Sequence, residues 1–226
     1  NKDELDTILS IAESASNEGV DLESEFYLLA LTAYFAGNYE ISEGYCKQAL
    51  RKSRKSKQKE MEAIITFLIG DIYKIRGNIA EAEKTYHSSL KISEELDNSD
   101  IKASAFNRIG IILEEKGNLE QAEEMYNYAL NIYKNNGDEG KYIGVKSNLS
   151  SLMYLRGNID EVIEISLEKI SYYRSKEDAK SNHLLIEAMM NHAVFLSQKM
   201  LYSEAEIILK NVLFCFEELE EKRGLA

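Results

Sequence analysis

The sequence predicts an all-α protein built as a stack of helical hairpins. Three observations carry this prediction: Gly-Asn pairs recur at a fixed interval, each pair separates two segments of helical periodicity, and the composition favours helix over sheet. Proline and tryptophan are absent, glycine is limited to 12 of 226 residues, and hydrophobic residues make up 44%. This mixture is typical of a helical domain that buries a substantial core.

The Gly-Asn pairs mark the predicted corners between helices. They begin 40 residues apart each time, at Gly37, Gly77, Gly117 and Gly157. A weaker fifth copy starts at Met200, 43 residues after the fourth, where the glycine has been lost. Because glycine adopts the left-handed conformation that ends a helix, each corner is expected to close one helix of an antiparallel hairpin.

The asparagines of these corners are also predicted to begin the next helix. Three of them stand three residues before an acidic or amide side chain, in the pairs Asn78 and Glu81, Asn118 and Gln121, and Asn158 and Glu161. This is the spacing of a capping box. The same tetrapeptide is therefore expected to end one helix and cap its successor.

Small and large residues recur in register with the corners. The small ones include Gly70 and Gly110, Ala82 and Ala122, and Ser89 and Ala129; the large ones include Tyr73, Tyr86, Phe106 and Tyr126. This pattern resembles that of the tetratricopeptide repeat (TPR) family over almost the whole chain. The fourth unit departs from it, with Ser150, Val162 and Lys169 at small positions.

The resemblance implies a right-handed α-solenoid of about five TPR hairpins with an extra N-terminal helix. The 40-residue period resembles a long-repeat subclass that includes Pins-type spindle-orientation adaptors and bacterial regulators that respond to signalling peptides. We expect one solenoid over residues 1–226, with repeats at 21–60, 61–100, 101–140, 141–183 and 184–221. Residues 1–20 are expected to form a cap or the second half of an incomplete hairpin, and 222–226 the start of a further repeat.

Charge and hydropathy exclude several classes of partner. The chain carries 27 Lys+Arg against 39 Asp+Glu, a formal charge of −12, which repels phosphate backbones and anionic lipids. We therefore expect neither nucleic acid nor membrane partners, and no apolar stretch reaches the roughly 18 residues of a membrane span. The two cysteines, Cys46 and Cys215, lie in apolar helical patterns and are interpreted as reduced thiols of a cytoplasmic protein.

No arrangement of residues predicts catalysis. The sequence contains no nucleophile elbow, phosphate-binding glycine loop, kinase motif or histidine-carboxylate pair. The three histidines, His87, His183 and His192, have no partner at zinc-ligand spacing. We expect a non-enzymatic protein without cofactor or metal, in which His192 occupies a packing position.

The predicted function is a non-catalytic scaffold that binds a peptide segment of another protein, as the sensor or adaptor part of a larger regulatory protein. The resemblance implies that the first helix of every hairpin lines a concave groove. The candidate groove residues are Tyr27, Phe67, Asp71, Asn107, Arg108, Ser147, Asn148, Ser151, Tyr154, Met190 and Asn191.

Two kinds of contact are expected in this groove. Asn148 and Asn191 occupy equivalent places in consecutive hairpins, where amides can hold the backbone of an extended peptide, and Arg108 one hairpin earlier would provide a fork for a carboxylate. The aromatic residues and Met190 would form pockets for ligand side chains. The alternatives are that the polar residues are merely solvated and that the aromatic ones contact neighbouring helices.

A different function is a structural solenoid that self-associates. A stack of repeats exposes an apolar face at each end. A homo-oligomer formed through the terminal repeats is therefore the alternative to a peptide-binding scaffold.

Overall fold

The structure, a computed structural model, describes the backbone of residues 22–176 and 179–224. Its side chains are described over residues 25–176 and 182–216. Within the described backbone the chain forms ten α-helices and no strand, which confirms the predicted all-α repeat fold. The expected helix at residues 1–20 lies outside the described residues.

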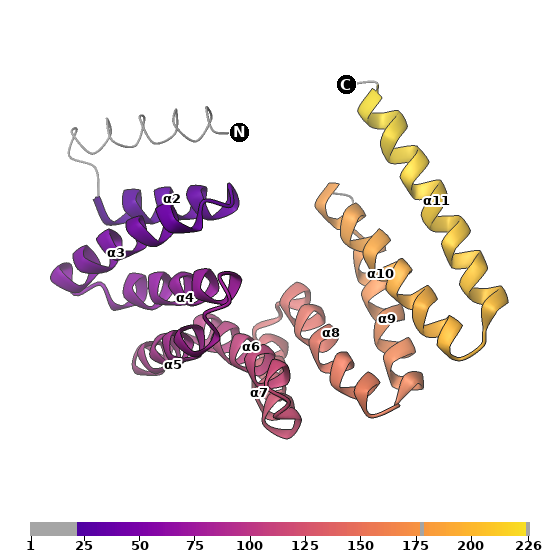
Figure 1. Ribbon diagram of the computed structural model, residues 1–226, viewed down its shortest axis with the longest axis horizontal. Coiled ribbons are helices and arrows are strands. Elements are labelled where there is room, and N and C mark those ends of the chain that lie inside the picture. The colour runs from indigo at the N-terminus through magenta and orange to yellow at the C-terminus, as the bar shows by residue number, and fades with distance from the viewer. Residues whose placement is uncertain (1–21, 177–178, 225–226) are drawn as a thin grey trace. The chain divides into compact units, whose positions relative to one another are not determined.

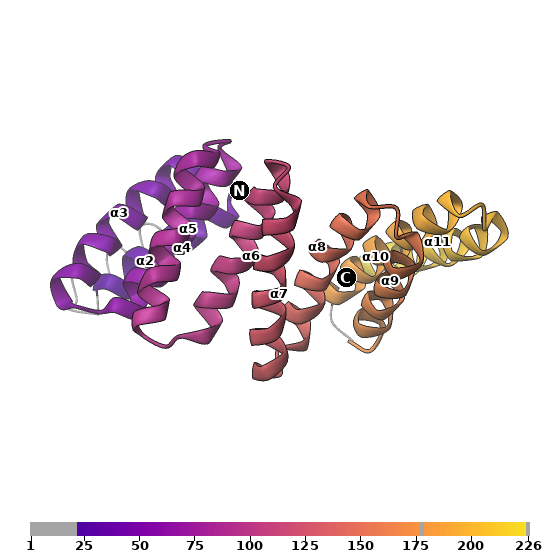
Figure 2. The same ribbon diagram turned by 90° about the horizontal axis from the view of Figure 1, so that it is seen from below.

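The ten helices follow one another as five hairpins (Figures 1 and 2). They are α2 (Leu22–Phe35) and α3 (Tyr39–Ser56), α4 (Lys59–Ile75) and α5 (Ile79–Glu95), α6 (Ser99–Glu115) and α7 (Leu119–Asn136), α8 (Glu139–Leu155) and α9 (Ile159–Arg174), and α10 (Ala179–Gln198) and α11 (Tyr202–Gly224). The packing divides these hairpins into two compact units, unit 1 up to Ile132 and unit 2 from Tyr133 onward. A single solenoid running through both units, and its right hand, stay predictions.

The corners form as the glycine pattern predicts. Gly37, Gly77, Gly117 and Gly157 have φ angles of 78°, 77°, 78° and 82°. The following asparagine donates its backbone N–H to a carbonyl five residues back, as from Asn78 to Tyr73 at 2.8 Å. This bond closes the last turn of the first helix in the manner of a Schellman motif. Where the glycine is lost, Met200 takes the same left-handed conformation, with φ 61°.

The predicted capping boxes at Asn78 and Asn158 are wrong, and the one at Asn118 stays a prediction. Asn78 and Asn158 make no side-chain cap bond, and their ψ angles of 65° and 57° lie below the extended range of an N-cap. Their geometry serves the closure of the preceding helix instead. Side-chain caps occur between hairpins, where Asn98 accepts from the backbone N–H of Ile101 and Asp138 from that of Lys141, at 3.1 and 3.0 Å.

The helix bounds refine the predicted repeats. The first helices α4, α6 and α8 each begin two residues before the predicted starts, but α10 begins at Ala179 instead of residue 184. α10 has 20 residues, whereas α4, α6 and α8 have 17 each. The longer interval before the Met200 corner is thus absorbed by a longer helix. Residues 222–224 continue the backbone of α11, and a further repeat after it stays a prediction.

The core of the second and third hairpins is organised by a tyrosine lying against a glycine. The Tyr86 and Tyr126 side chains are fully buried. A Cβ placed on Gly70 would stand 2.6 Å from Tyr86 Cε1, and one on Gly110 would stand 2.7 Å from Tyr126 Cε1. The small position therefore exists to admit the ring.

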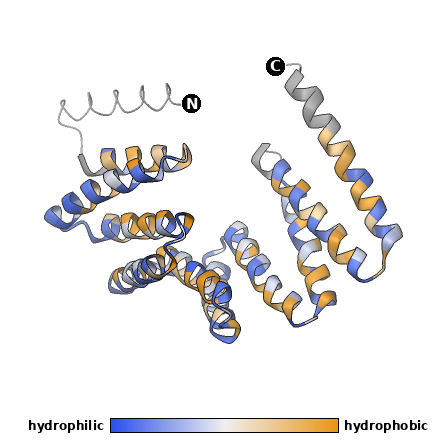
Figure 3. Ribbon diagram, in the orientation of Figure 1, coloured by the Kyte–Doolittle hydropathy of each residue, from blue (hydrophilic) through white to orange (hydrophobic). Residues whose placement is uncertain are grey.

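The first helices α4 and α6 bury more residues than the second helices α3 and α5. Eight residues of α4 are buried, against four of α3, and Figure 3 shows α4 hydrophobic over much of its length while α3 is mostly hydrophilic. α4 contacts its own partner α5 and also α3 and α6. Few residues of α4 consequently stay accessible.

Candidate functional site

Each unit carries a cavity formed largely by its first helices. The cavity of unit 1 has a volume of about 260 Å³. Its lining comes mainly from α2, α4 and the start of α6 and comprises Tyr27, Leu31, Tyr34, Phe35, Ile64, Phe67, Leu68, Asp71, Asp100, Ile101 and Ser104. The structure therefore brings together three predicted groove residues, Tyr27, Phe67 and Asp71, with the neighbouring rings of Tyr34 and Phe35.

The polar end of the unit 1 cavity is a paired carboxylate. Asp71 accepts the hydroxyl of Tyr86 at 2.5 Å and Nε of Arg108 at 2.8 Å. Burial, followed by the charge of Asp71, raises the pKa of Tyr86 above its ordinary value. The phenol therefore stays a hydrogen-bond donor at neutral pH. Asp71 is a structural anchor between the helices as well as part of the cavity wall.

Arg108 is engaged within the protein. The sequence suggested an accessible fork for a ligand carboxylate, but the guanidinium binds both oxygens of Asp71, with Nη2 at 3.4 Å from Oδ2. It also lies 5.8 Å from the centre of the Phe67 ring. A ligand would have to compete with Asp71 for Arg108, so the cavity offers chiefly its aromatic walls.

The aromatic walls suit an apolar side chain. Tyr34 and Phe35 meet edge to face with ring centres 5.5 Å apart, and Phe67 contacts Tyr86 at 5.5 Å. Burial raises the pKa of Tyr27 and of Tyr34, so both phenols are neutral. Rigid aromatic rings provide contact area at little conformational cost, as binding pockets require.

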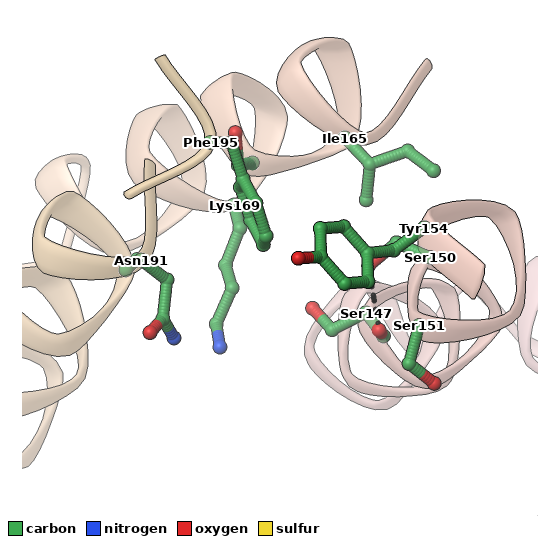
Figure 4. A pocket seen from close by; sticks show the side chains of 10 residues that line it. Ser147, Ser150, Ser151, Tyr154, Ile165, Lys169, Asn191 and Phe195 are labelled. Atoms are coloured by element: carbon green, nitrogen blue, oxygen red, sulfur yellow. Dashed lines mark hydrogen bonds between the residues drawn. The ribbon is translucent and has the colours of Figure 1, made fainter. Parts of the chain in front are cut away.

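The cavity of unit 2 lies among α8, α9 and α10 and has a volume of about 200 Å³ (Figure 4). It is lined by Ser147, Ser150, Ser151, Tyr154, Ile165, Ser166, Lys169, Ala188, Asn191 and Phe195. Four of these residues, Ser147, Ser151, Tyr154 and Asn191, were predicted groove residues. Lys169 and Phe195 were not, although Lys169 had been recognised as an exception to the repeat pattern.

The walls of the unit 2 cavity are fixed by internal contacts. Tyr154 and Phe195 have ring centres 5.9 Å apart, and Gln198 donates Nε2 to the Tyr154 hydroxyl at 2.6 Å. The hydroxyls of Ser147 and Ser150 donate to backbone carbonyls one turn back, at 3.0 and 2.7 Å. Their oxygens therefore face the cavity as acceptors.

Ser166 and His192 form a buried pair beside this cavity. Ser166 Oγ donates to the Ile163 carbonyl at 2.7 Å and lies 2.7 Å from His192 Nδ1. Burial lowers the pKa of His192, which keeps the ring neutral. The predicted packing role of His192 is confirmed, since its side chain is buried.

The remaining predicted residues line neither cavity. Asn107 and Asn148 are half-buried, and Met190 is exposed. The amide ladder stays a prediction. Over the described residues no group of three metal-ligating side chains occurs, and none of the described helices is long and apolar enough to cross a membrane.

Comparison with known proteins agrees with the repeat architecture. Residues 61–135 match the family model described as tetratricopeptide repeat, over the second and third hairpins. No curated protein matches the sequence.

Solved structures share the fold over most of the chain. BtubC (BKLC) from P. vanneervenii aligns with a TM-score of 0.79 at 17% identity, over 96% of this chain and 90% of its own. A Rap protein complexed with competence and sporulation factor aligns at 0.62 and 16%, over 88% and 65%. The apo form of the quorum sensor NprR from B. thuringiensis aligns at 0.63 and 18%, over 95% and 71%. At these identities the likeness shows the fold alone.

Proposed function

We propose that this chain, which carries tetratricopeptide repeats over residues 61–135, is a non-catalytic protein-interaction module that binds a peptide segment of a partner protein. The observation that carries the proposal is a cavity in each unit that is lined largely by side chains of the first helices. Each cavity accepts one anchor side chain of the peptide.

The chemistry of the cavities supports a protein ligand. Aromatic and aliphatic walls with a few fixed polar groups resemble the anchor pockets of protein interfaces, where a small number of buried side chains supply most of the affinity. The net charge of −12 disfavours nucleic acid and anionic membranes. The partner in this proposal is therefore a protein segment.

The structural neighbours favour a regulatory role. One is a Rap protein in complex with competence and sporulation factor, and another is a quorum sensor. By analogy of fold, the module would act as the sensor or adaptor portion of a cytoplasmic regulator, with ligand binding favouring one arrangement of the hairpins over another.

The test is a selection followed by mutation. Peptides are selected from a random display library on the full chain, and their affinities are measured by fluorescence anisotropy. Phe67→Ala or Tyr154→Ala should weaken a selected peptide by at least ~10-fold, because truncating a central aromatic anchor removes about 1.4 kcal/mol or more. Tyr128→Ala and Leu167→Ala, on second helices, are the matched controls. Peptides that respond only to the second-helix variants would disprove the groove.

One observation favours a second candidate, self-association. On α11 the side chains of Leu213 and Phe214 are 63% and 59% exposed, and exposed apolar groups of this size favour association. Sedimentation equilibrium distinguishes the two functions, since a dimer that Leu213→Glu converts to a monomer would support the structural role.

A further inference from the structure

The hairpin of α8 and α9 breaks the tyrosine-on-glycine packing of the two hairpins before it. In the 40-residue register, Ser150 follows Gly70 and Gly110, and Ser166 follows Tyr86 and Tyr126. Both the glycine and the ring that covers it have thus been replaced by serine. The ring that fills the second and third hairpins is missing in the fourth.

The missing ring coincides with the unit 2 cavity. Ser150 and Ser166 both line this cavity of about 200 Å³. A water molecule accounts for about 30 Å³, so the space is several times larger than one water. With one heavy atom counted as roughly one water molecule, the cavity has room for a side chain of about five heavy atoms.

A lysine enters the cavity at a position that is small elsewhere. Lys169 follows Ser89 and Ala129 in the register, and its side chain is only 17% exposed. Figure 4 shows the Lys169 chain running from α9 toward the space between Asn191 and Ser147. A cation drawn into a partly apolar site attracts a counter-charge more strongly than one on the open surface does.

Within the protein the counter-charge of Lys169 is loosely held. Lys169 Nζ lies 3.6 Å from Glu187 Oε1, and the Glu187 side chain is 50% exposed. By contrast, Lys146 on the same hairpin makes a short ion pair with Glu168. A distant, exposed pair contributes little stability, so an incoming carboxylate can displace Glu187 at small cost.

We propose that the unit 2 cavity binds a glutamate side chain of the partner peptide, with its carboxylate on Lys169 and its methylenes against Ile165, Ala188 and Phe195. This inference rests on the proposed peptide-binding function and gives it a chemical preference. The apolar lining favours glutamate because the side chain must carry its charge past aliphatic walls to reach Nζ. The negative charge of the whole chain weakens this binding only modestly, since charges more than about 8 Å away are largely screened at physiological salt.

The experiment uses a minimal probe on the full chain. N-acetyl-glutamate N-methylamide and its glutamine counterpart are titrated against protein carrying ¹³C-labelled Ile and Ala methyl groups. The methyl signals of Ile165 and Ala188 report on the cavity. The glutamate probe should shift both signals saturably and bind at least fivefold tighter than the glutamine probe. N-acetyl-alanine, with a terminal carboxylate only, should bind more weakly than the glutamate probe.

Four variants test the roles of individual residues. Lys169→Met keeps the aliphatic stem and should abolish the preference for glutamate over glutamine, while Lys146→Met should leave it unchanged. Glu187→Gln removes the internal competitor and should tighten glutamate binding two- to fivefold. The double variant Ser150→Gly with Ser166→Tyr restores the packing of the earlier hairpins and should eliminate the saturable shifts while the circular dichroism stays helical.

The possible outcomes separate this inference from the proposed function. Equal binding of the two probes, or a glutamate preference that survives in Lys169→Met, overturns the glutamate site. If peptides selected from the library still depend on Phe67 or Tyr154, the interaction module stands without it. If no peptide depends on any first-helix residue, the proposed function itself fails.

Discussion

A methyl group added at Gly70 is the sharpest perturbation of the repeat packing. The new Cβ would stand 2.6 Å from Tyr86 Cε1 and 2.7 Å from its Cδ1, far inside normal contact. The ring cannot move aside easily, because it is fully buried and its hydroxyl donates to Asp71 at 2.5 Å. Asp71 is held in turn by Arg108.

Two effects set the size of the loss for Gly70→Ala. Forcing an extra methyl into a packed core destabilises by about 1–3 kcal/mol. Displacing the Tyr86 hydroxyl weakens a hydrogen bond to a charged group, which contributes about 1.5–3 kcal/mol. The expected loss in free energy of unfolding is about 3–5 kcal/mol, partly offset by the better helix propensity of alanine.

Gly44→Ala is the matched control. Gly44 lies in the middle of α3, is exposed, and has nothing within 4 Å of the added Cβ. Alanine should therefore stabilise the helix by about 0.5–1 kcal/mol. Urea denaturation followed by circular dichroism measures both variants. If Gly70→Ala is as harmless as Gly44→Ala, the tyrosine-on-glycine packing does not organise the hairpin, and the argument for the unit 2 cavity loses its basis.

Three further predictions concern a corner, a thiol and a buried hydroxyl. Met200→Gly should stabilise by about 1 kcal/mol, because a left-handed conformation disfavours side chains; an unchanged melting temperature would contradict it. Burial raises the pKa of Cys46 to about 12 from 9.0, so at pH 8 Cys215 should react with an alkylating reagent and Cys46 only on unfolding. The buried, protonated thiol of Cys46 contributes fully to stability below pH 9, and this contribution falls as the pH rises toward 12. Tyr86→Phe should cost about 1–3 kcal/mol, because Asp71 loses a donor; chemical denaturation checks it, and a neutral result would show that Arg108 alone satisfies the carboxylate.

The sequence was sufficient to predict the hairpins, because one local interaction defines each corner. A glycine in the left-handed conformation is readable from its spacing, and four of the five corners carry it. The caps were mispredicted because Asn78 and the equivalent asparagines donate their backbone N–H groups to carbonyls of the preceding helix, and this geometry closes that helix. Asn98 and Asp138, which do cap helices, stand 40 residues apart in the turns between hairpins, but Gln58 in the same register makes no side-chain cap.

The candidate site was only partly predictable, because packing partners come from other hairpins. Arg108 was expected to face a ligand, but its partner Asp71 lies 37 residues earlier in the sequence, and no local sequence pattern indicates the pair. Lys169 was visible as an exception to the repeat, yet its significance depends on Ser150 and Ser166 being small at the same place. Ser150, Ser166 and Lys169 depart from the repeat at the same place, and the three departures together would have predicted the cavity.

Peptide ligands should be bound on the first helices. Site-specific photo-crosslinking with a selected peptide tests it directly, with p-benzoylphenylalanine placed at Phe67 and Tyr154 on first helices and at Tyr128 and Leu167 on second helices. If the peptide is bound on the first helices, crosslinks should form from at least one first-helix position and from none of the second-helix positions. Crosslinks confined to Tyr128 or Leu167 would contradict it.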